Sequence, residues 1–597
     1  MKHLDGKRLH YAFSCGMDEV IKCRQHLDEI NVFPVADGDT GTNLAITLEA
    51  MMAGASRDDD ISIVGAHLAD AALGGSRGNS GIIFAQFVVG LSRGLTHKTT
   101  ASISDFVQAA ETGVDTAYRA LGKPVEGTIL TVMRAWSEAM KRIPVGQQNF
   151  AGFLHHALRA ARKALAETPK KLKVLEEAHV VDAGAEGFVH FVRGMTESLL
   201  ERLPGHVSAN PQPAHVLVTA EMITRESEPP AQRYCVEMLL EPLHSGPHDI
   251  RTALSELGRS LIVADGATRI KVHLHTDRPD AVAEALLPLG RLLEQKVDDM
   301  VLQHASFQYP LADIAVVTDT SCDLPDALMQ QFQVHQVPLS IQWGEHAFLD
   351  KRTLTAANFY AMQKERQTSP KSSQPAVKQF VRLYRNLALS HKSVISIHLS
   401  SALSGTVEAA RLAADSVKEI PVHIIDGRHL STSLGLMVHT VAEAVASGAS
   451  LASVMALAET LPKRTDIFVA VKTLKYMIRG GRVSPLKGRV ARALHLCPIV
   501  ALDENGRSML LDKSFGFKGN LRKIIRRVQT RACIDQAVKW AVGHAGNPED
   551  ARALANALTP VLGMPPAYLM DISPIIGAHA GVGAVSASVL WEAGKRT

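Results

Sequence analysis

The chain has 597 residues, of which 46% are apolar and 21% charged, so we expect roughly three or four globular domains. Its net charge of +4 and its 5% of aromatic residues argue against nucleic acid as a partner. The six cysteines show no disulfide-framework spacing, and the N-terminus lacks a signal-peptide core. Because no apolar run reaches about 18 residues either, we expect a cytoplasmic protein without a transmembrane segment.

The segment 31–43, NVFPVADGDTGTN, places Asp37 and Asp39 on either side of a glycine. A tight turn of this kind allows both carboxylates to face one way, and Mg²⁺ usually binds one or two carboxylates together with phosphate oxygens. Hydroxyl and amide side chains follow at the start of an apolar helical run, where N–H groups attract phosphate: Thr40, Thr42 and Asn43. Taken alone, the segment is equally compatible with a solvated Asp-Gly turn and a helix cap.

Three further Gly-containing loops each precede a run with helical periodicity. They are GGSRGNSG (74–81), KPVEGT (123–128) and VDAGAEG (181–187). Each loop places small residues and free backbone N–H groups at the start of a helix. Arg77 in the first of them is compatible with a phosphate contact or with a plain surface position.

Four such loops in this order resemble the ATP-binding helical barrel of the DhaL (DAK2) family. Their sequence motifs are most similar to its fatty acid kinase branch. The resemblance implies an all-α kinase domain at 1–203. It also implies that Asp37 and Asp39 bind Mg²⁺ between the β- and γ-phosphates of ATP, with Asn31 as a weaker, neutral ligand. The residues implied to surround the nucleotide are Thr40, Thr42, Asn43, Gly78, Asn79, Ser80, Gly81, Thr128, Asp182 and Gly184.

A segment with three prolines, LPGHVSANPQPAH (203–215), marks the first domain boundary. Beyond it the pattern predicts a small α/β domain at 214–308. An amphipathic helix is expected at 248–261. Strands are expected at 215–224, 233–241 and 269–276.

Two of these strands carry metal-binding side chains. His273 and His275 share one face of their strand and can both face Cys235 on the other. A thiolate with two imidazoles is a plausible Zn²⁺ set that leaves a fourth position for water, although the spacing alone favours a buried cysteine and two unrelated histidines. The motif YCxE followed by KVHxHTxxP resembles the middle domain of fatty acid kinases. This resemblance implies a Zn²⁺ site at these positions. Whether that zinc is structural or takes part in the chemistry stays open.

A second boundary falls at Tyr309-Pro310. The remaining chain predicts a larger α/β domain at 312–594 with a parallel sheet. Its buried strand-like runs lie at 313–321, 393–400, 422–427 and 467–473. Polar clusters follow several runs, where loops of an open α/β sheet collect ligands, although isolated Ser/Thr clusters are more often turn and cap residues.

Six polar clusters of this domain resemble, in order, those of the DegV family, whose members bind fatty acids through an α/β fold with two subdomains. The clusters are VTDTS (317–321), SSQP (372–375), LSSALSGT (399–406), RGGRV (479–483), CPI (497–499) and GAHAGVG (577–583). The resemblance implies that Ser372 and Ser404 hydrogen-bond the lipid carboxylate. It places Arg482 and His579 at the mouth, near the transferred phosphate, as substrate-binding and catalytic residues. The other residues implied around the head group are Ser373, Gln374, Gly405 and Thr406.

The DegV-like part departs from its family in three places. Ser372 stands where Thr is usual, Cys497 replaces a Lys, and Ala580 with Val582 makes the last loop more apolar. The resemblances together imply a single-chain fatty acid kinase that transfers the ATP γ-phosphoryl group to a fatty acid and forms an acyl phosphate. The alternatives are a small-polyol kinase of the dihydroxyacetone type and a non-catalytic lipid-binding regulator gated by ATP. Acyl chain length, and transfer within one chain or across a homodimer, stay open.

Overall fold

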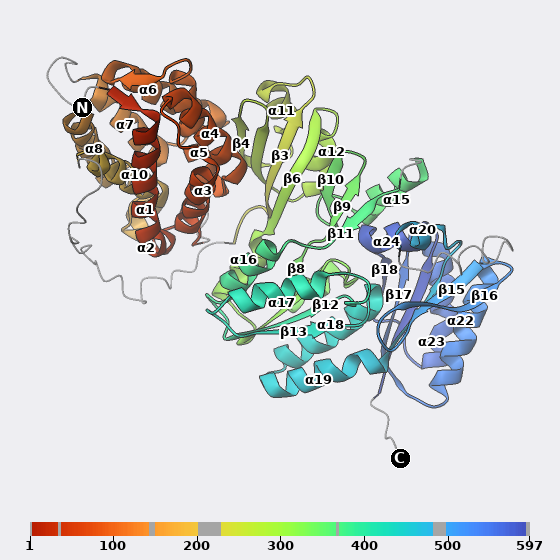
Figure 1. Ribbon diagram of the computed structural model, residues 1–597. Coiled ribbons are helices and arrows are strands. Elements are labelled where there is room, and N and C mark those ends of the chain that lie inside the picture. The colour runs from red at the N-terminus through yellow and green to blue at the C-terminus, as the bar shows by residue number, and fades with distance from the viewer. Residues whose placement is uncertain are drawn as a thin grey trace. The chain divides into compact units, whose positions relative to one another are not determined.

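The computed structural model describes residues 3–33, 38–142, 150–200, 229–365, 369–481 and 497–592. The chain divides into two compact units (Figure 1). The first comprises Met1–Arg278 with Ala285–Met300, and the second comprises Pro279–Glu284 with Val301–Thr597.

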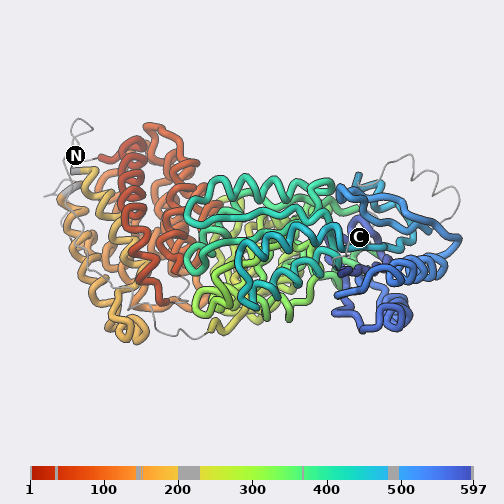
Figure 2. Tube along the Cα trace, turned by 90° about the horizontal axis from the view of Figure 1, so that it is seen from below, coloured from red at the N-terminus to blue at the C-terminus, as the bar shows by residue number. Residues whose placement is uncertain are grey.

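The described residues up to position 200 form helices and their connections, as predicted, apart from a short antiparallel pair of strands, β1 (His3–Asp5) and β2 (Thr100–Ser102). Figure 2 shows many of these helices running side by side. They are α1 (Gly6–Lys22), α2 (Arg24–Glu29), α3 (Thr40–Gly54), α4 (Ile61–Gly75), α5 (Gly78–Gly94), α6 (Ile103–Ala120), α7 (Ile129–Lys141), α8 (Phe150–Ala166), α9 (Lys173–Ala178) and α10 (Ala183–Leu200).

Helix α5 is the centre of this helical domain. Every residue from 81 to 91 is buried, because α3, α4 and α6 pack around it. A helix that is apolar on all sides is stable only in such an interior. Edge-to-face ring contacts join Phe87 of α5 to Trp136 of α7 and Phe188 of α10. The loops that precede α5, α7 and α10 are thereby held at fixed positions.

The middle part of the chain is a four-stranded antiparallel sheet in the order β4-β5-β3-β6. Its elements are β3 (Tyr234–Pro242), α11 (Pro247–Leu254), β4 (Arg259–Asp265), β5 (Ile270–Thr276), α12 (Pro279–Leu286) and β6 (Gly290–Asp299). The helix predicted at 248–261 is wrong beyond Leu254, because the chain turns there and Arg259 begins β4. The strand predicted at 215–224, like the boundary at 203–215, lies outside the described residues.

This sheet packs against the helical domain through β4. Ile262 and Ala264 are part of the same apolar core as the helices. The N–H of Gly122 donates to the carbonyl of Leu261 at 3.3 Å, and Arg93 Nη2 lies 3.0 Å from a carboxylate oxygen of Asp265. Apolar burial and polar contacts therefore join both parts of the first unit.

The second unit contains a four-stranded parallel sheet in the order β13-β12-β7-β8, which confirms the predicted parallel sheet. A six-stranded sheet in the order β16-β15-β14-β19-β17-β18 forms a second subdomain, and β9, β10 and β11 form a small third sheet. The strands are β7 (Ile314–Asp319), β8 (His335–Val337), β9 (Ser340–Trp343), β10 (His346–Leu349), β11 (Lys371–Ser373), β12 (Ser393–His398), β13 (Val422–Asp426), β14 (Thr465–Ala470), β15 (Cys497–Leu502), β16 (Ser508–Ser514), β17 (Ala537–His544), β18 (Tyr568–Asp571) and β19 (Val585–Trp591).

The run at 467–473 was predicted for the parallel sheet, and this is wrong. It contributes to β14, which pairs antiparallel with β15 and β19. A strand buried on both faces reads as a continuous apolar run in either kind of sheet, so its sequence does not reveal its direction.

The helices of the second unit cover these sheets. They are α13 (Met300–Gln308), α14 (Asp326–Gln331), α15 (Ala356–Glu365), α16 (Val377–Leu387), α17 (Thr406–Ser416), α18 (Ser431–Ala446), α19 (Leu451–Arg464), α20 (Lys475–Arg479), α22 (Phe517–Ala532), α23 (Pro548–Leu562) and α24 (Pro574–Ala580). Helix α18 contacts β7 of one sheet and β14, β17 and β19 of the other, and residues 431–439 are all buried. One helix thus joins the two subdomains. Among the described helices of the whole chain, none combines the length and apolarity needed to cross a bilayer.

Candidate functional site

The start of α3 is held by a residue that the sequence did not single out. Asp28 of α2 accepts hydrogen bonds from the N–H of Thr42 at 2.9 Å and from its hydroxyl at 2.7 Å. Burial raises the pKa of Asp28, the Thr42 bonds oppose the rise, and the nearby Asp39 carboxylate adds to it. The Thr42 hydroxyl, predicted to face the nucleotide, therefore binds Asp28 and supports the start of α3. Asp37 lies outside the described residues.

The four predicted phosphate loops lie together in the first unit. A Cβ on Gly78 would lie 2.5 Å from the side-chain nitrogen of Asn43, so the loop before α5 rests directly on the start of α3. A Cβ on Gly184 would lie 2.7 Å from the hydroxyl of Ser80, which places α10 against α5 in the same way. Glycine is required at these approaches because any side chain would separate the loops.

The remaining loop, 123–128 before α7, joins this group through Asp182, which belongs to the loop before α10. Its carboxylate accepts from the N–H of Ala185 at 2.8 Å and interacts with the N–H of Ile129, the first residue of α7. Thr128, just before α7, is buried, and its hydroxyl donates to the carbonyl of Val125 at 2.8 Å. Burial raises the pKa of Asp182 to about 7, against the two backbone bonds. Asp182 therefore ties two helix starts together.

The sheet of the middle part contributes a buried charged group to the same loops. Glu237 of β3 is 2% exposed, and one of its oxygens accepts from the N–H of Gly78 at 2.9 Å. The ammonium group of Lys271 on β5 donates to the carbonyl of Ser76. Arg77 Nη1 lies 3.6 Å from the other Glu237 oxygen, so Arg77 pairs with a buried carboxylate and is no plain surface residue.

The cationic side chains around Glu237 determine its protonation state. Burial alone would raise the pKa of its carboxyl, but Lys296, Lys271 and Arg77 together hold it well below its usual range. A buried carboxylate is tolerated only with such partners. Glu237 is therefore ionised at neutral pH.

Cys235, His273 and His275 lie together on the same sheet, as the resemblance to the fatty acid kinase middle domain implied. One ligand atom from each residue lies within 4.8 Å of those of the other two. His273 and His275 are 1% and 9% exposed, and the Nε2 atom of His273 has no hydrogen-bond partner among the described residues. Burial lowers the pKa of His273 to about 3 and that of His275 to about 4, so both imidazoles are neutral.

This donor set fits Zn²⁺, which takes neutral imidazole and thiolate ligands in a closed or water-completed tetrahedron. Burial raises the pKa of the Cys235 thiol well above its usual value, so a cation is needed to make it a thiolate. The charge of Asp39 adds to that rise, which places the acidic loop within electrostatic reach of Cys235.

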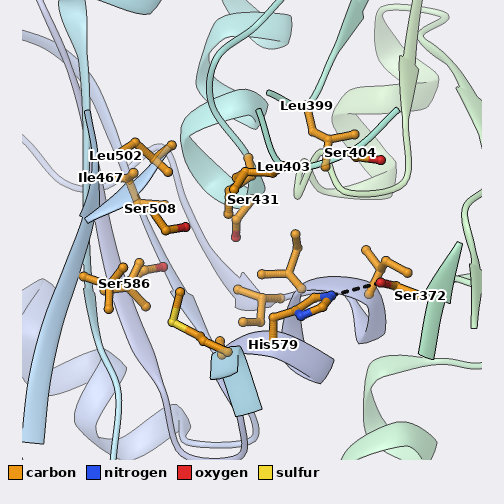
Figure 3. A pocket seen from close by; sticks show the side chains of 18 of the residues that line it. Ser372, Leu399, Leu403, Ser404, Ser431, Ile467, Leu502, Ser508, His579 and Ser586 are labelled. Carbon is orange, nitrogen blue, oxygen red and sulfur yellow. Dashed lines mark hydrogen bonds between the residues drawn. The ribbon is translucent and has the colours of Figure 1, made fainter. Parts of the chain in front are cut away.

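A cavity of about 360 Å³ lies in the second unit between β14, β15 and α24. Figure 3 shows Ser372 and His579 on one side of it and Ser508 and Ser586 on the other. Ser372 Oγ lies 3.0 Å from His579 Nε2. The apolar lining residues are Leu339, Leu399, Leu403, Leu430, Ile467, Val469, Val471, Met477, Val500, Ala501, Leu502, Ile572, Ile575, Ile576 and Ala580.

Most of the predicted head-group residues line this cavity. They are Ser372, Ser373, Gln374, Ser404, Gly405 and His579. Thr406 is fully buried as the first residue of α17, its hydroxyl lies 2.9 Å from that of Ser404, and it is not among the lining residues. Arg482 lies outside the described residues.

A fully buried chain of polar groups supports one wall of the cavity. Asp319 Oδ2 lies 3.0 Å from His398 Nδ1 and accepts from the N–H of Leu399, while Ser396 Oγ lies 2.7 Å from His398 Nε2. The hydroxyl of Tyr384 completes the chain at 2.9 Å from Ser396. Because Leu399 and the following loop line the cavity, this network holds that wall in place.

Three family models match the chain in succession. The DAK2 domain matches residues 34–197, the FakA-like middle domain of fatty acid kinases matches residues 231–307, and the DegV family, described as uncharacterised, matches residues 313–592. The chain therefore joins three domain types: DAK2, fatty acid kinase middle domain and DegV.

Similar proteins match only parts of the chain. Protein YloV of Bacillus subtilis strain 168 is 31% identical over 322 residues, which is 51% of this chain and 57% of that protein. An uncharacterized protein of Staphylococcus saprophyticus is 31% identical over 315 residues, or 50% of this chain and 56% of that protein. The chain thus spans a little over half the length of the curated relatives it matches.

Two similar solved structures are a fatty acid-binding DegV family protein from Thermus thermophilus and DegV, a fatty acid binding protein from Bacillus subtilis. Each is 28% identical to this chain and covers 47% of it, with a TM-score of 0.44. The match covers 99% of the Thermus chain and 100% of the Bacillus chain.

Proposed function

We propose that this chain is a fatty acid kinase that transfers the γ-phosphoryl group of ATP to a fatty acid carboxylate. One observation carries the proposal: a single chain combines DAK2-type loops, packed against one another at the starts of α3, α5, α7 and α10, with a DegV-type apolar cavity that ends on hydroxyl and imidazole groups. The covalent link would give the two sites an effective concentration that reaches about millimolar where their geometry lets them meet.

The cavity suits an acyl chain with a polar head. An apolar tail gains about 0.8 kcal/mol for each CH₂ group that leaves water. A buried carboxylate needs hydrogen-bond donors, which Ser372 and Ser404 would supply, while His579 holds the Ser372 hydroxyl in place. Arg482 would add positive charge at the mouth.

In the kinase domain, Asp39 with Asp37 and Asn31 would bind Mg²⁺, and the four helix starts would hold the phosphates through their N–H groups. The bound cation supplies charge neutralisation for the phosphate oxygens. A carboxylate oxygen then attacks the γ-phosphorus, so that one O–P bond forms while the bond to ADP breaks. The acceptor is already anionic, and no general base is needed. Cys235, His273 and His275 would hold Zn²⁺ beside this site.

The test is a hydroxylamine trap on the purified chain with MgATP and a fatty acid. We expect fatty hydroxamate from the wild type and a loss of at least about 100-fold in Asp39→Asn, because charge neutralisation is the main catalytic contribution in phosphoryl transfer. Fatty acid binding should be unchanged in the variant.

Other outcomes separate the alternatives. Phosphorylation of dihydroxyacetone that does not respond to fatty acid would identify a small-polyol kinase. Bound fatty acid without hydroxamate, in a chain that still binds ATP, would identify a regulator and contradict the kinase proposal.

A further inference from the structure

The Cys/His/His site and the phosphate loop before α5 are joined by one face of one sheet. In the antiparallel register of β3 and β5, Cys235 pairs with His275 and Glu237 with His273. Residues two apart on a strand share a face, so Glu237 and Lys271 lie on the face that carries the three metal-binding side chains. The Nδ1 atom of His273 is 4.0 Å from a Glu237 oxygen.

Side chains on this face contact three consecutive loop residues, Ser76, Arg77 and Gly78. Glu237 accepts from the N–H of Gly78, Lys271 donates to the carbonyl of Ser76, and Arg77 pairs with Glu237. The side chains of Glu237 and Lys271 are 2% and 3% exposed, so water does not compete for these bonds.

The position of the Ser76–Ser80 loop depends on these contacts with Glu237 and Lys271. Gly78 has a φ of +60° and sits against Asn43 with no room for a side chain. Gly78 begins α5, and the next residues, Asn79 and Ser80, are two of those expected to surround the nucleotide. A small displacement of Glu237 therefore moves the N–H groups that would face the phosphates.

We propose that Glu237 is a positioning residue that couples the Cys235/His273/His275 site to the Ser76–Ser80 loop, so that Zn²⁺ and nucleotide each strengthen the binding of the other. Zinc bound to one thiolate and two imidazoles fixes neighbouring side chains of β3 and β5, and with them the carboxylate that holds Gly78. Such coupling is reciprocal by thermodynamic necessity. The inference rests on the proposed function for the identity of the nucleotide.

The experiment measures the affinity of MgADP for the full chain by calorimetry, after metal removal by chelation and again with one equivalent of Zn²⁺. We expect zinc to tighten nucleotide binding about tenfold in the wild type, within the usual range for coupled sites. In Glu237→Gln the zinc content should remain one per chain, while the tightening falls below about twofold. A purely structural role of Glu237 would change the melting temperature but not this ratio.

Glu241→Gln is the matched control. Glu241 lies on the same strand, pairs with Arg291 and contacts no loop residue in its described bonds, so this variant should keep the full coupling. Hydrogen exchange at the Gly78 amide of the wild type supplies a second measurement, since it should slow when zinc is added even if Glu237→Gln fails to fold.

Equal nucleotide affinity with and without zinc in the wild type, or full coupling retained in Glu237→Gln, would overturn the inference. If hydroxamate still forms in either case, the kinase proposal stands. A wild-type chain that binds no nucleotide under any condition overturns both.

Discussion

At the scale of single residues, Asp182 makes stability depend on pH. Its folded-state pKa of about 7 lies above the ordinary value of 3.8, so the folded chain binds this proton more tightly than the unfolded chain. The stability from the protonated form is complete below about pH 4 and is lost as pH rises toward 7.

We therefore expect Asp182→Asn, which keeps the oxygen that accepts from Ala185, to remove this loss. Between pH 5 and 7 the free energy of unfolding of the wild type should fall relative to the variant by on the order of a few kcal/mol. Urea unfolding at several pH values measures the difference. Parallel pH profiles for the two proteins would refute the assignment.

At the scale of elements, α24 carries His579 and is positioned by its contact with α15. A Cβ on Gly577 would lie 2.5 Å from the hydroxyl oxygen of Tyr360, which is 3% exposed and donates to the carbonyl of Ile572. Only glycine allows the two helices to approach this closely.

We expect Gly577→Ala to lower stability by about 1–3 kcal/mol, as overpacking does, and to weaken fatty acid binding because α24 moves His579 away from Ser372. Melting temperature and fatty acid titration measure the two effects. Gly516→Ala is the control, since a Cβ on Gly516 would meet no atom within 4 Å and the backbone there is extended. A variant at Gly577 that binds lipid like the control would show that α24 does not position the site.

The four Gly-containing loops could be predicted as helix starts because each carries its own local pattern: glycine, hydroxyl or acidic residues, then a helical run. The contacts that bring these loops together could not be predicted from the sequence. Glu237 and Gly78, for example, are 159 residues apart, and no local pattern around either residue indicates their hydrogen bond. Asp28 was missed for the same reason. The helix predicted through 261 failed because residues from Arg259 pair with β5 instead, and Gly258 allows the close approach to the His275 carbonyl, which a Cβ there would meet at 2.2 Å.

At the scale of the whole molecule, the sequence predicted a helical part, a small α/β part and a larger α/β part in this order, and the described residues bear this order out. The structure groups the first two into one compact unit, which the proline-containing segment between them did not suggest. The reason is physical: β4 places Ile262 and Ala264 in the core of the helices, and this shared burial is invisible in a boundary drawn from composition.

The cavity of about 360 Å³ has a consequence for the resting state of the protein. Its mostly apolar lining is partly open to solvent, and a ligand that binds only the folded chain stabilises it, by about 2.7 kcal/mol at a free concentration 100 times its Kd. A fatty acid bound as proposed would therefore raise the free energy of unfolding of the second unit as well as serve as substrate. We expect the chain purified from cells to carry lipid, which organic extraction followed by mass spectrometry would reveal.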